Sequence, residues 1–284
     1  MNVLSLFSGA GGGDIATTHL IGHRIIGYVE IEDYCQRVIA QRIEDGLLPC
    51  APIFGDIRAF IDQGYADGYK GVADCITGGF PCQPFSLAGK RNGEDDARNM
   101  WPETIECIRR IRPRRAFLEN VPGLLSSGYF GRILGDLAEA GYDTQWIVLS
   151  ADDCGAPHER KRLWMVAYSN KNRCDWKNIS LWAKQEKNFG IARSGAEISN
   201  PMCKGLAEPE MLGSVFFQGK REKIERGCVS YGGWRRDPAD DAESGLGRMV
   251  NGVAYRVDRI KAIGNGQVSC VAATAWNLLI GRDV

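Results

Sequence analysis

The sequence is poor in the residues that hold metals. It has only three histidines, and its ten cysteines show neither regular spacing nor a C-x-x-C pair. Structural zinc sites take their ligands from closely spaced cysteines and histidines, and disulfide frameworks need cysteines in a regular set. We therefore expect no metal site and no disulfide framework, and we expect the thiols to be reduced.

Long hydrophobic runs are missing as well. No apolar stretch approaches the ~20 residues that cross a bilayer, and the first residues lack the basic region and apolar core of a signal peptide. The 284 residues suffice for one large domain that carries a smaller one. We expect a cytoplasmic protein, intracellular in a bacterial or phage-type setting, without membrane contact.

The chain also lacks net charge, because 35 basic residues balance 35 acidic ones. The balance conceals an asymmetry: residues 168–236 carry 13 basic and 7 acidic side chains, a net charge of +6. A basic segment of this kind suits a surface that faces phosphates. A merely solvated surface would have the same composition.

What the sequence does contain is a cysteine between two prolines, within the stretch Gly-Gly-Phe-Pro-Cys-Gln-Pro-Phe-Ser at 78–86. The apolar run at 72–77 is typical of a buried parallel strand, and the glycines after it predict a turn. Cys82 then lies past a strand end, at the edge where open α/β sheets bind ligands. Pro81 and Pro84 restrict the backbone and would hold the thiol in one direction. A reactive cysteine and a buried structural cysteine both fit this stretch taken alone.

A second glycine-rich turn lies near the N-terminus. Residues 3–7 form an apolar run, residues 8–13 read Ser-Gly-Ala-Gly-Gly-Gly, and an amphipathic stretch follows. Glycines let a backbone approach a ligand closely, and the start of a helix offers free N–H groups. Tight helix packing is the alternative explanation.

Three acids follow predicted strands. Glu30 ends the strand predicted at 24–30, which is where nucleotide-binding α/β folds place the carboxylate for ribose hydroxyls. Asp56 follows a short strand at 52–54, and Glu119 lies near the end of a strand at 115–122. Glu119 is therefore expected at the same edge as Cys82. Each could also be a solvated acid at a strand end.

The remaining periodicity completes an α/β pattern. Helices are predicted at 103–112, 130–140 and 268–280, and strands at 143–150 and 163–168. Repeated strand and helix units call for a mostly parallel sheet with helices on both faces. Between 169 and 247 the periodicity fades and Asn, Lys, Gly and Arg become frequent, so we expect a small loop-rich domain there. The predicted domains are 1–168, 169–247 and a return segment, 248–284, that completes the first.

Five motifs in this order resemble the DNA cytosine-5 methyltransferase family over nearly the whole chain except its middle segment. The resemblance implies a mixed, Rossmann-like sheet that binds S-adenosyl-L-methionine, and duplex DNA as the partner of a monomeric enzyme. The motifs are Phe7-Ser8-Gly9-Ala10-Gly11-Gly12, Pro81-Cys82-Gln83, Glu119-Asn120-Val121, Arg160-Lys161-Arg162 and Gly264-Asn265-Gly266.

By position, the resemblance also implies the residues that bind the methyl donor. Glu30 and Ile31 would contact its ribose and adenine, and Asp56 and Ile57 would lie near the adenine. The other members of the implied pocket are Phe7, Ser8, Gly9, Gly11, Pro81, Met100, Asn265 and Gly266.

The implied chemistry needs a nucleophile, because C5 of cytosine is itself a poor one. The thiolate of Cys82 would add to C6 of a flipped-out cytosine and push electrons onto C5 for attack on the donor's methyl group. Glu119 would offset the charge that builds on the ring. Arg160 and Arg162 would hold the base's O2 and a nearby carboxylate or phosphate. The middle segment, 169–247, would be the target-recognition domain.

Some features depart from the family pattern. His158 stands where glutamine is common, Ser5 where an acid is frequent, and Ala88 where serine is common. None of these takes part in the proposed electron flow. An RNA (tRNA) cytosine-5 methyltransferase and a catalytically silent DNA-binding homologue are the two alternatives. The target sequence, a cognate nuclease and the base that removes the C5 proton cannot be derived from these residues.

Overall fold

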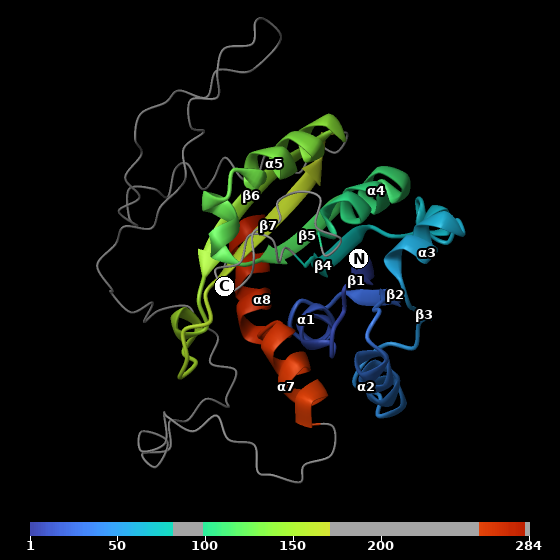
Figure 1. Ribbon diagram of the computed structural model, residues 1–284, viewed down its shortest axis with the longest axis vertical. Helices are drawn as coiled ribbons and strands as arrows, with labels where there is room; N and C mark the ends of the chain where they lie inside the picture. Colours follow the sequence, from blue (N-terminus) through green and yellow to red (C-terminus); the bar gives the residue numbers. More distant parts are fainter. Residues whose placement is uncertain (82–98, 171–255, 282–284) are drawn as a thin grey trace, which may run out of the picture.

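The computed structural model describes residues 1–81, 99–170 and 256–281. Their core is a seven-stranded sheet in the order β3-β2-β1-β4-β5-β7-β6, with helices on both faces (Figure 1). Strand β7 runs antiparallel to its neighbours β5 and β6, and the pairs among β1 to β5 are parallel. The expected mixed α/β sheet is therefore confirmed. The strands are β1 Asn2–Leu6, β2 Arg24–Val29, β3 Ile53–Phe54, β4 Cys75–Gly79, β5 Arg115–Asn120, β6 Tyr142–Leu149 and β7 Arg162–Ser169.

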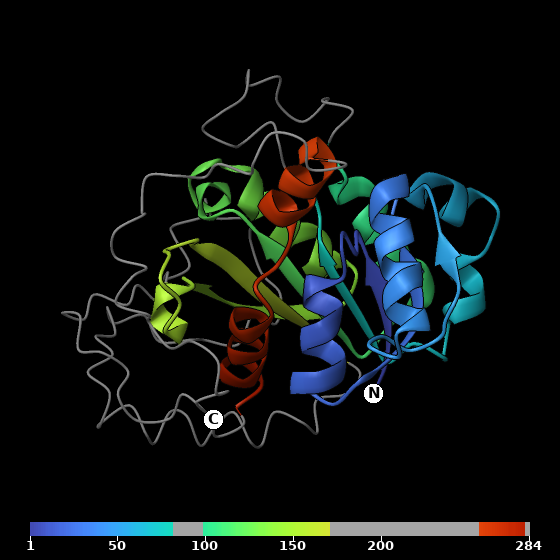
Figure 2. The ribbon, with the colours of Figure 1, turned by 90° about the horizontal axis from the view of Figure 1, so that it is seen from below.

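The helices divide between the two faces because side chains alternate along each strand. On β1, Leu4 faces the hydrophobic cluster under α3, α4 and α5, whereas Val3 faces the cluster under α1, α2 and α8. Figure 2 shows α8 beside α1 on this second face. The longer helices are α2 Asp33–Glu44, α4 Trp101–Ile111, α5 Tyr129–Glu139, α7 Arg256–Asn265 and α8 Ser269–Ile280, and the shorter ones are α1 Gly12–Ile15 and α3 Ile57–Asp62.

Short helical turns complete the described part of the chain. One is a π-helical turn that continues α1, and its Ala16 is fully buried. These turns are Ala16–Leu20, Ala66–Tyr69, Pro122–Ser126 and Asp152–Cys154.

The strand predicted before Cys82 was placed too early in the sequence. The sequence predicts a strand at 72–77 followed by a glycine turn, but β4 begins at Cys75 and contains both Gly78 and Gly79. A Cβ on Gly78 would lie 3.0 Å from the Leu6 carbonyl oxygen, and one on Gly79 would lie 2.6 Å from Glu119 Oε2. These glycines are therefore required by close neighbours in the sheet rather than by a turn.

Helix α8 packs against strands β5 and β7 of the sheet. Trp276 of α8 is buried against Phe117 of β5, with ring centroids 5.3 Å apart, and Tyr168 of β7 donates a hydrogen bond of 2.6 Å to the Leu279 carbonyl. The proposed middle domain at 169–247 lies outside the described residues except for Ser169 and Asn170.

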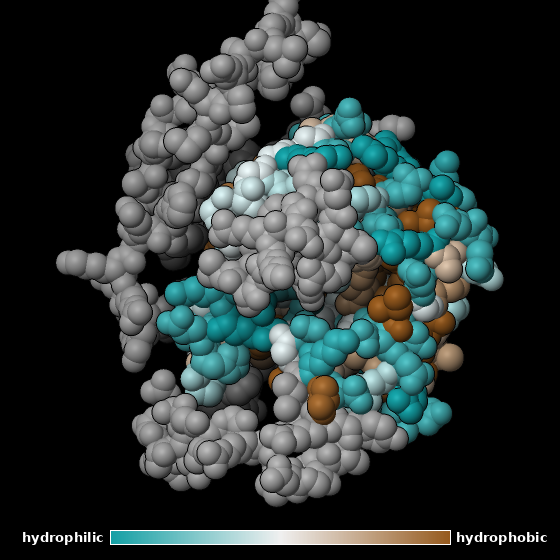
Figure 3. Space-filling view, viewed as in Figure 1, coloured by the Kyte–Doolittle hydropathy of each residue, from teal (hydrophilic) through white to brown (hydrophobic). Residues whose placement is uncertain are grey.

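The described surface shown in Figure 3 is largely hydrophilic, with separate hydrophobic patches. None of the helices in residues 1–81, 99–170 and 256–281 is long and apolar enough to cross a membrane.

Candidate active site

The predicted site residues that the structure describes gather at one edge of the sheet. Parallel strands β1, β2, β4 and β5 end at this edge, and the antiparallel β7 begins there. Register pairs Gly79 of β4 with Glu119 of β5, and Asn120 with Leu163 of β7. Arg162, the first residue of β7, therefore lies beside the end of β5. The turn between α7 and α8 reaches the same edge.

The first glycine turn is bound to the end of β2. The Gly9 N–H donates to Glu30 Oε2 at 2.6 Å, and the Glu32 N–H donates to Oε1 at 2.8 Å. Burial raises the pKa of the Glu30 carboxyl, and these two backbone donors act in the opposite direction. Each carboxylate oxygen keeps a further lone pair that can accept a hydroxyl hydrogen.

The surroundings of Glu30 fit a nucleoside. The Ile31 side chain is 65% exposed, which leaves an apolar surface next to the carboxylate. Asp56 caps α3 by accepting the Arg58 N–H at 2.9 Å, and Ile57 packs into the core with Phe60. A ligand could therefore reach Ile57 through its backbone rather than its side chain.

The turn residues of the implied pocket have specific backbone requirements. Phe7 has a φ of 52°, and Gly9 and Gly11 have φ values of 55° and 80°. The Ser8 hydroxyl lies 2.9 Å from the Ser5 hydroxyl and 3.2 Å from the Ser5 carbonyl. A Cβ on Gly9 would meet nothing within 4 Å among the described residues, so the space beside this residue is open to a ligand.

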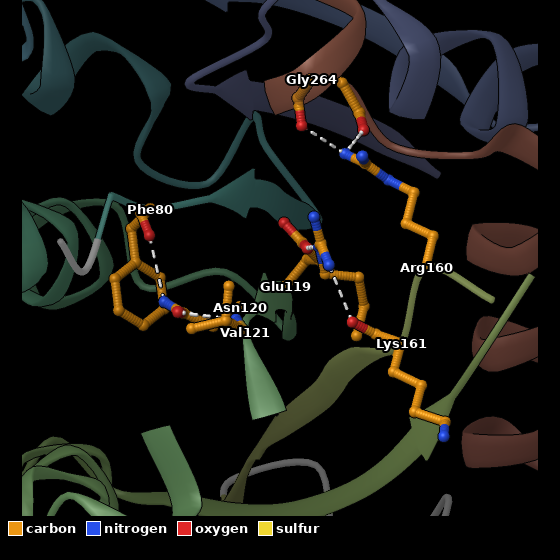
Figure 4. A network of polar contacts seen from close by, with 9 residues as sticks. Phe80, Glu119, Asn120, Val121, Arg160, Lys161 and Gly264 are labelled. Carbon is orange, nitrogen blue, oxygen red and sulfur yellow. Dashed lines mark hydrogen bonds and ion pairs between the residues drawn. The ribbon is translucent and has the colours of Figure 1, made fainter. Parts of the chain in front are cut away.

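Glu119 is buried beside two arginines (Figure 4). Arg162 Nε lies 2.9 Å from Glu119 Oε1, and the Gln267 side chain also hydrogen-bonds the carboxylate. Burial raises the pKa of the Glu119 carboxyl, whereas Arg162, Arg160 and the hydrogen bonds lower it. Burial has the larger effect, so the Glu119 carboxyl takes up its proton at a higher pH, closer to neutral, than a carboxyl in water does.

Arg160 holds the return segment. Its guanidinium group donates to the Gly264 carbonyl at 2.8 Å and also to the Gly266 carbonyl. Figure 4 shows the side chain reaching toward Gly264, and the positive charge of Arg160 still lowers the pKa of Glu119. Of the two arginines expected at the base, the structure thus brings Arg162 to the acid and places Arg160 on the turn that contains Asn265.

Asn120 fixes the backbone at Phe80, two residues before Cys82. Its side-chain amide donates to the Phe80 carbonyl at 3.0 Å, and its side-chain oxygen accepts the Val121 N–H at 2.8 Å. The Met100 N–H donates to the Pro81 carbonyl at 3.3 Å. Pro81 and Met100 are therefore neighbours, although they are far apart in the sequence. Cys82 itself lies outside the described residues.

Two residues at this site were not identified from the sequence. Gln267 directly follows the Gly264-Asn265-Gly266 motif and is not part of it. Asp14 is fully buried in α1 with a hydrogen bond to Ser5, and burial raises its pKa to about 7. Its Oδ2 has no hydrogen-bond partner within the described part of the chain. An acid next to a run of glycines gave no signal that it would be buried.

The described residues contain no group of three or more His, Cys, Asp or Glu side chains that could hold a metal ion.

The mixed sheet carries a glycine turn, the Glu30 carboxylate and the buried Glu119 at one edge, and it has the Rossmann-like fold of methyltransferases that use S-adenosyl-L-methionine. The family model "C-5 cytosine-specific DNA methylase" matches residues 1–224, and the chain belongs to this family.

Curated relatives agree with the family. The chain is 35% identical over 195 residues to the Type II methyltransferase M.NgoMIV of Neisseria gonorrhoeae, a match that covers 66% of this chain and 58% of that enzyme. It is 33% identical over 177 residues to M.HpaII of Haemophilus parainfluenzae, covering 58% and 45%. The chain thus spans about half the length of these relatives.

Among solved structures, a mutant of Spodoptera frugiperda DNMT2 matches with a TM-score of 0.49 and 24% identity, over 60% of this chain and 50% of that one.

Proposed function

We propose that this protein transfers a methyl group from S-adenosyl-L-methionine to C5 of a flipped-out cytosine in double-stranded DNA, through a covalent bond between Cys82 and C6. The proposal rests on one observation above all: a buried carboxyl, Glu119, is bound by Arg162 at the sheet edge and lies opposite Gly79, three residues before Cys82. Family membership supplies the reaction class.

The residues present fit the methyl donor. Glu30 retains acceptor capacity for ribose hydroxyls, Ile31 offers an exposed apolar face for adenine, and the open space at Gly9 admits a ligand next to the turn. When bound, S-adenosyl-L-methionine supplies an electrophilic methyl group. Phe7, Ser8, Gly11, Asp56, Ile57, Pro81, Met100, Asn265 and Gly266 complete the proposed pocket.

Glu119 acts on the base. As the Cys82 thiolate adds to C6, the C5–C6 π electrons move toward C5 and the ring becomes electron-rich. A carboxyl with a raised pKa can hold a proton at N3 and offset this charge. Arg162 orients that carboxyl and offers its remaining N–H groups to the O2 of the base. C5 bonds to the methyl carbon as the bond from that carbon to the donor's sulfur breaks, and sulfur keeps the electron pair. A base then takes the C5 proton, the C5–H electrons re-form the double bond, and the Cys82–C6 bond breaks to release Cys82 as a thiolate.

Arg160 has a supporting part in this proposal. Because its guanidinium group binds the carbonyls of Gly264 and Gly266, it holds the return segment against the site. Residues 169–247 would select the DNA sequence, and residues 248–284 would complete the catalytic domain that 1–168 begins. The enzyme would act on DNA as a monomer.

Transfer of a labelled methyl group tests the proposal. The purified protein should label long duplex DNA and leave transfer RNA unlabelled, and bisulfite sequencing should locate the label at cytosine C5. Labelling of transfer RNA alone would favour the RNA methyltransferase, and DNA binding without any transfer would favour the silent homologue.

Glu119→Gln separates a role at the base from a role in donor binding. The amide cannot supply the proton, so the methylation rate should fall by a factor of about 100 or more, in the range of general acid contributions. The affinity for S-adenosyl-L-methionine, measured by calorimetry, should stay within about twofold of wild type. Equal losses in rate and affinity would instead indicate a folding or donor-binding role.

A further inference from the structure

The turn between α7 and α8 is fixed on two sides. Arg160 binds its carbonyls from one side, and on the other the Ser269 hydroxyl donates to the Gly12 carbonyl at 2.7 Å. A Cβ on Gly12 would lie closer than 3.0 Å to the Gln267 carbonyl oxygen. The backbone of Gln267 therefore rests directly on the first residue of α1.

The Gln267 side chain continues from there toward the acid. A Cβ on Gly13 would lie closer than 3.0 Å to Gln267 Oε1, and one on Gly79 would lie 3.2 Å from Gln267 Nε2 and 2.6 Å from Glu119 Oε2. Because Gly13 and Gly79 have no side chains, the space between them is free for the Gln267 side chain. The amide nitrogen is the end that meets the carboxylate, since only the nitrogen can donate to it.

Three charged or polar side chains thus face Glu119 from different parts of the chain. Arg162 comes from β7, Arg160 from the segment before it, and Gln267 from the return segment. Gln267 is the member of this set that carries no charge, and it also lies against Gly12 and Gly13, which begin α1 directly after the turn expected to bind the methyl donor.

We propose that Gln267 is a positioning residue for Glu119: its amide holds the carboxylate beside Arg162 and ties the orientation of the acid to the start of α1 at Gly12 and Gly13. This inference rests on the proposed function, in which Glu119 acts on the base. The hydrogen bond from Gln267 is stronger to the ionised carboxylate than to the neutral carboxyl, so it stabilises the ionised form of Glu119.

Replacing the amide tests this directly. Gln267→Leu keeps the volume of the side chain and removes the donor, so the ionised form of Glu119 loses a charge-assisted hydrogen bond. The pKa of Glu119 should rise by about one unit, corresponding to the lower end of measured hydrogen bonds to charged groups. Carbon-13 NMR of labelled glutamate carboxyls follows this titration in the free protein, and Glu119→Gln identifies the signal.

A control and an activity readout complete the design. Gln41→Leu makes the same change on the exposed surface of α2, where the amide donates to Asp45 at 3.0 Å, and it should leave the Glu119 titration unchanged. In methylation assays of Gln267→Leu, the decline of kcat/KM at high pH should shift to a higher pH by about one unit, as the pKa of Glu119 does. In the Glu119→Gln background, Gln267→Leu should cause no further loss in kcat, because the two residues act as one unit.

The outcomes separate this inference from the proposed function. An unchanged Glu119 titration in a folded Gln267→Leu protein, or losses in kcat that multiply in the double variant, would overturn the positioning role. The NMR titration needs no turnover, so a rise in the Glu119 pKa would support the role of Gln267 even in a protein that methylates nothing.

Discussion

Glu119 and Asp14 are two buried acids with different partners. Glu119 has Arg162 at 2.9 Å and the Gln267 amide, so its ionised form is partly stabilised in spite of burial. Asp14 has a hydrogen bond to Ser5 and a more distant attraction to Arg42, and its Oδ2 is unbonded within the described residues. The first arrangement can exchange a proton at a reacting base, whereas the second favours a carboxyl that stays protonated.

Asp14 should therefore make stability depend on pH. Its folded pKa of about 7 exceeds the ordinary value of 3.8, so its contribution is fully present below about pH 4 and is lost as the pH rises to about 7. The loss amounts to about 4 kcal/mol at 1.36 kcal/mol per unit. Asp14→Asn stays neutral, and its free energy of unfolding should lack this decline.

Urea unfolding at a series of pH values from 4 to 8 measures the effect. Asp33→Asn is the control, because the Asp33 side chain is 81% exposed, and its curve should run parallel to wild type. A parallel curve for Asp14→Asn as well would show that Asp14 ionises freely in the folded protein.

At the level of elements, the return segment depends on glycine. Gly12 begins α1, and a Cβ there would meet the Gln267 carbonyl, a backbone atom that can move only if the turn between α7 and α8 moves. In an open helix, exchanging Gly for Ala stabilises by up to about 1 kcal/mol. We expect Gly12→Ala to destabilise instead, lowering the free energy of unfolding by about 1–3 kcal/mol, as at other overpacked sites.

Gly131→Ala supplies the matched control. Gly131 lies within α5, where a Cβ would meet nothing within 4 Å of the described atoms, so this variant should be more stable than wild type. Chemical denaturation of both variants decides the matter. If Gly12→Ala were as stable as Gly131→Ala, the return segment would not pack on α1 as described.

The sequence predicted most strands because their apolar runs are local features. Leu163 to Tyr168 lies within β7, and the strand expected at 115–122 corresponds to β5, which ends at Asn120. Gly78 and Gly79 were misassigned to a turn. Glycine fits these positions because Leu6 and Glu119 lie close by, and that proximity arises only when β1, β4 and β5 are paired. Gln267 was missed for the same cause: its contacts lie on α1, β4 and β5. Helices between the early strands were implied by the repeated strand and helix units, but the helices at 33–44 and 57–62 were not located from the sequence.

At the level of the whole molecule, charge and chemistry are expected to lie in different parts of the chain. The net charge of +6 falls on residues 168–236, nearly all outside the described residues, whereas the site lies at the edge of the described sheet. This division predicts that DNA affinity and methyl-donor affinity can be changed separately.

Neutralising Lys220, Arg221 and Lys223 together should weaken DNA binding and reduce its dependence on salt. For every phosphate that the variant no longer neutralises, the slope of log K against log salt should become shallower by about 0.9. Affinity for S-adenosyl-L-methionine should not change. Fluorescence anisotropy with a labelled duplex at several salt concentrations measures the slope, and an unchanged slope would show that this stretch does not face DNA.

The proposed bond between Cys82 and cytosine C6 is tested most directly by trapping the protein on DNA that contains 5-fluorocytosine. Fluorine at C5 cannot leave as a proton does, so the reaction should stop with the protein attached to the DNA. Long duplexes substituted throughout remove the need to know the target sequence. With S-adenosyl-L-methionine present, we predict an adduct that survives denaturing electrophoresis and maps to Cys82 by mass spectrometry, and none with Cys82→Ser. Absence of the adduct from wild-type protein that still binds both DNA and the methyl donor would contradict the covalent mechanism.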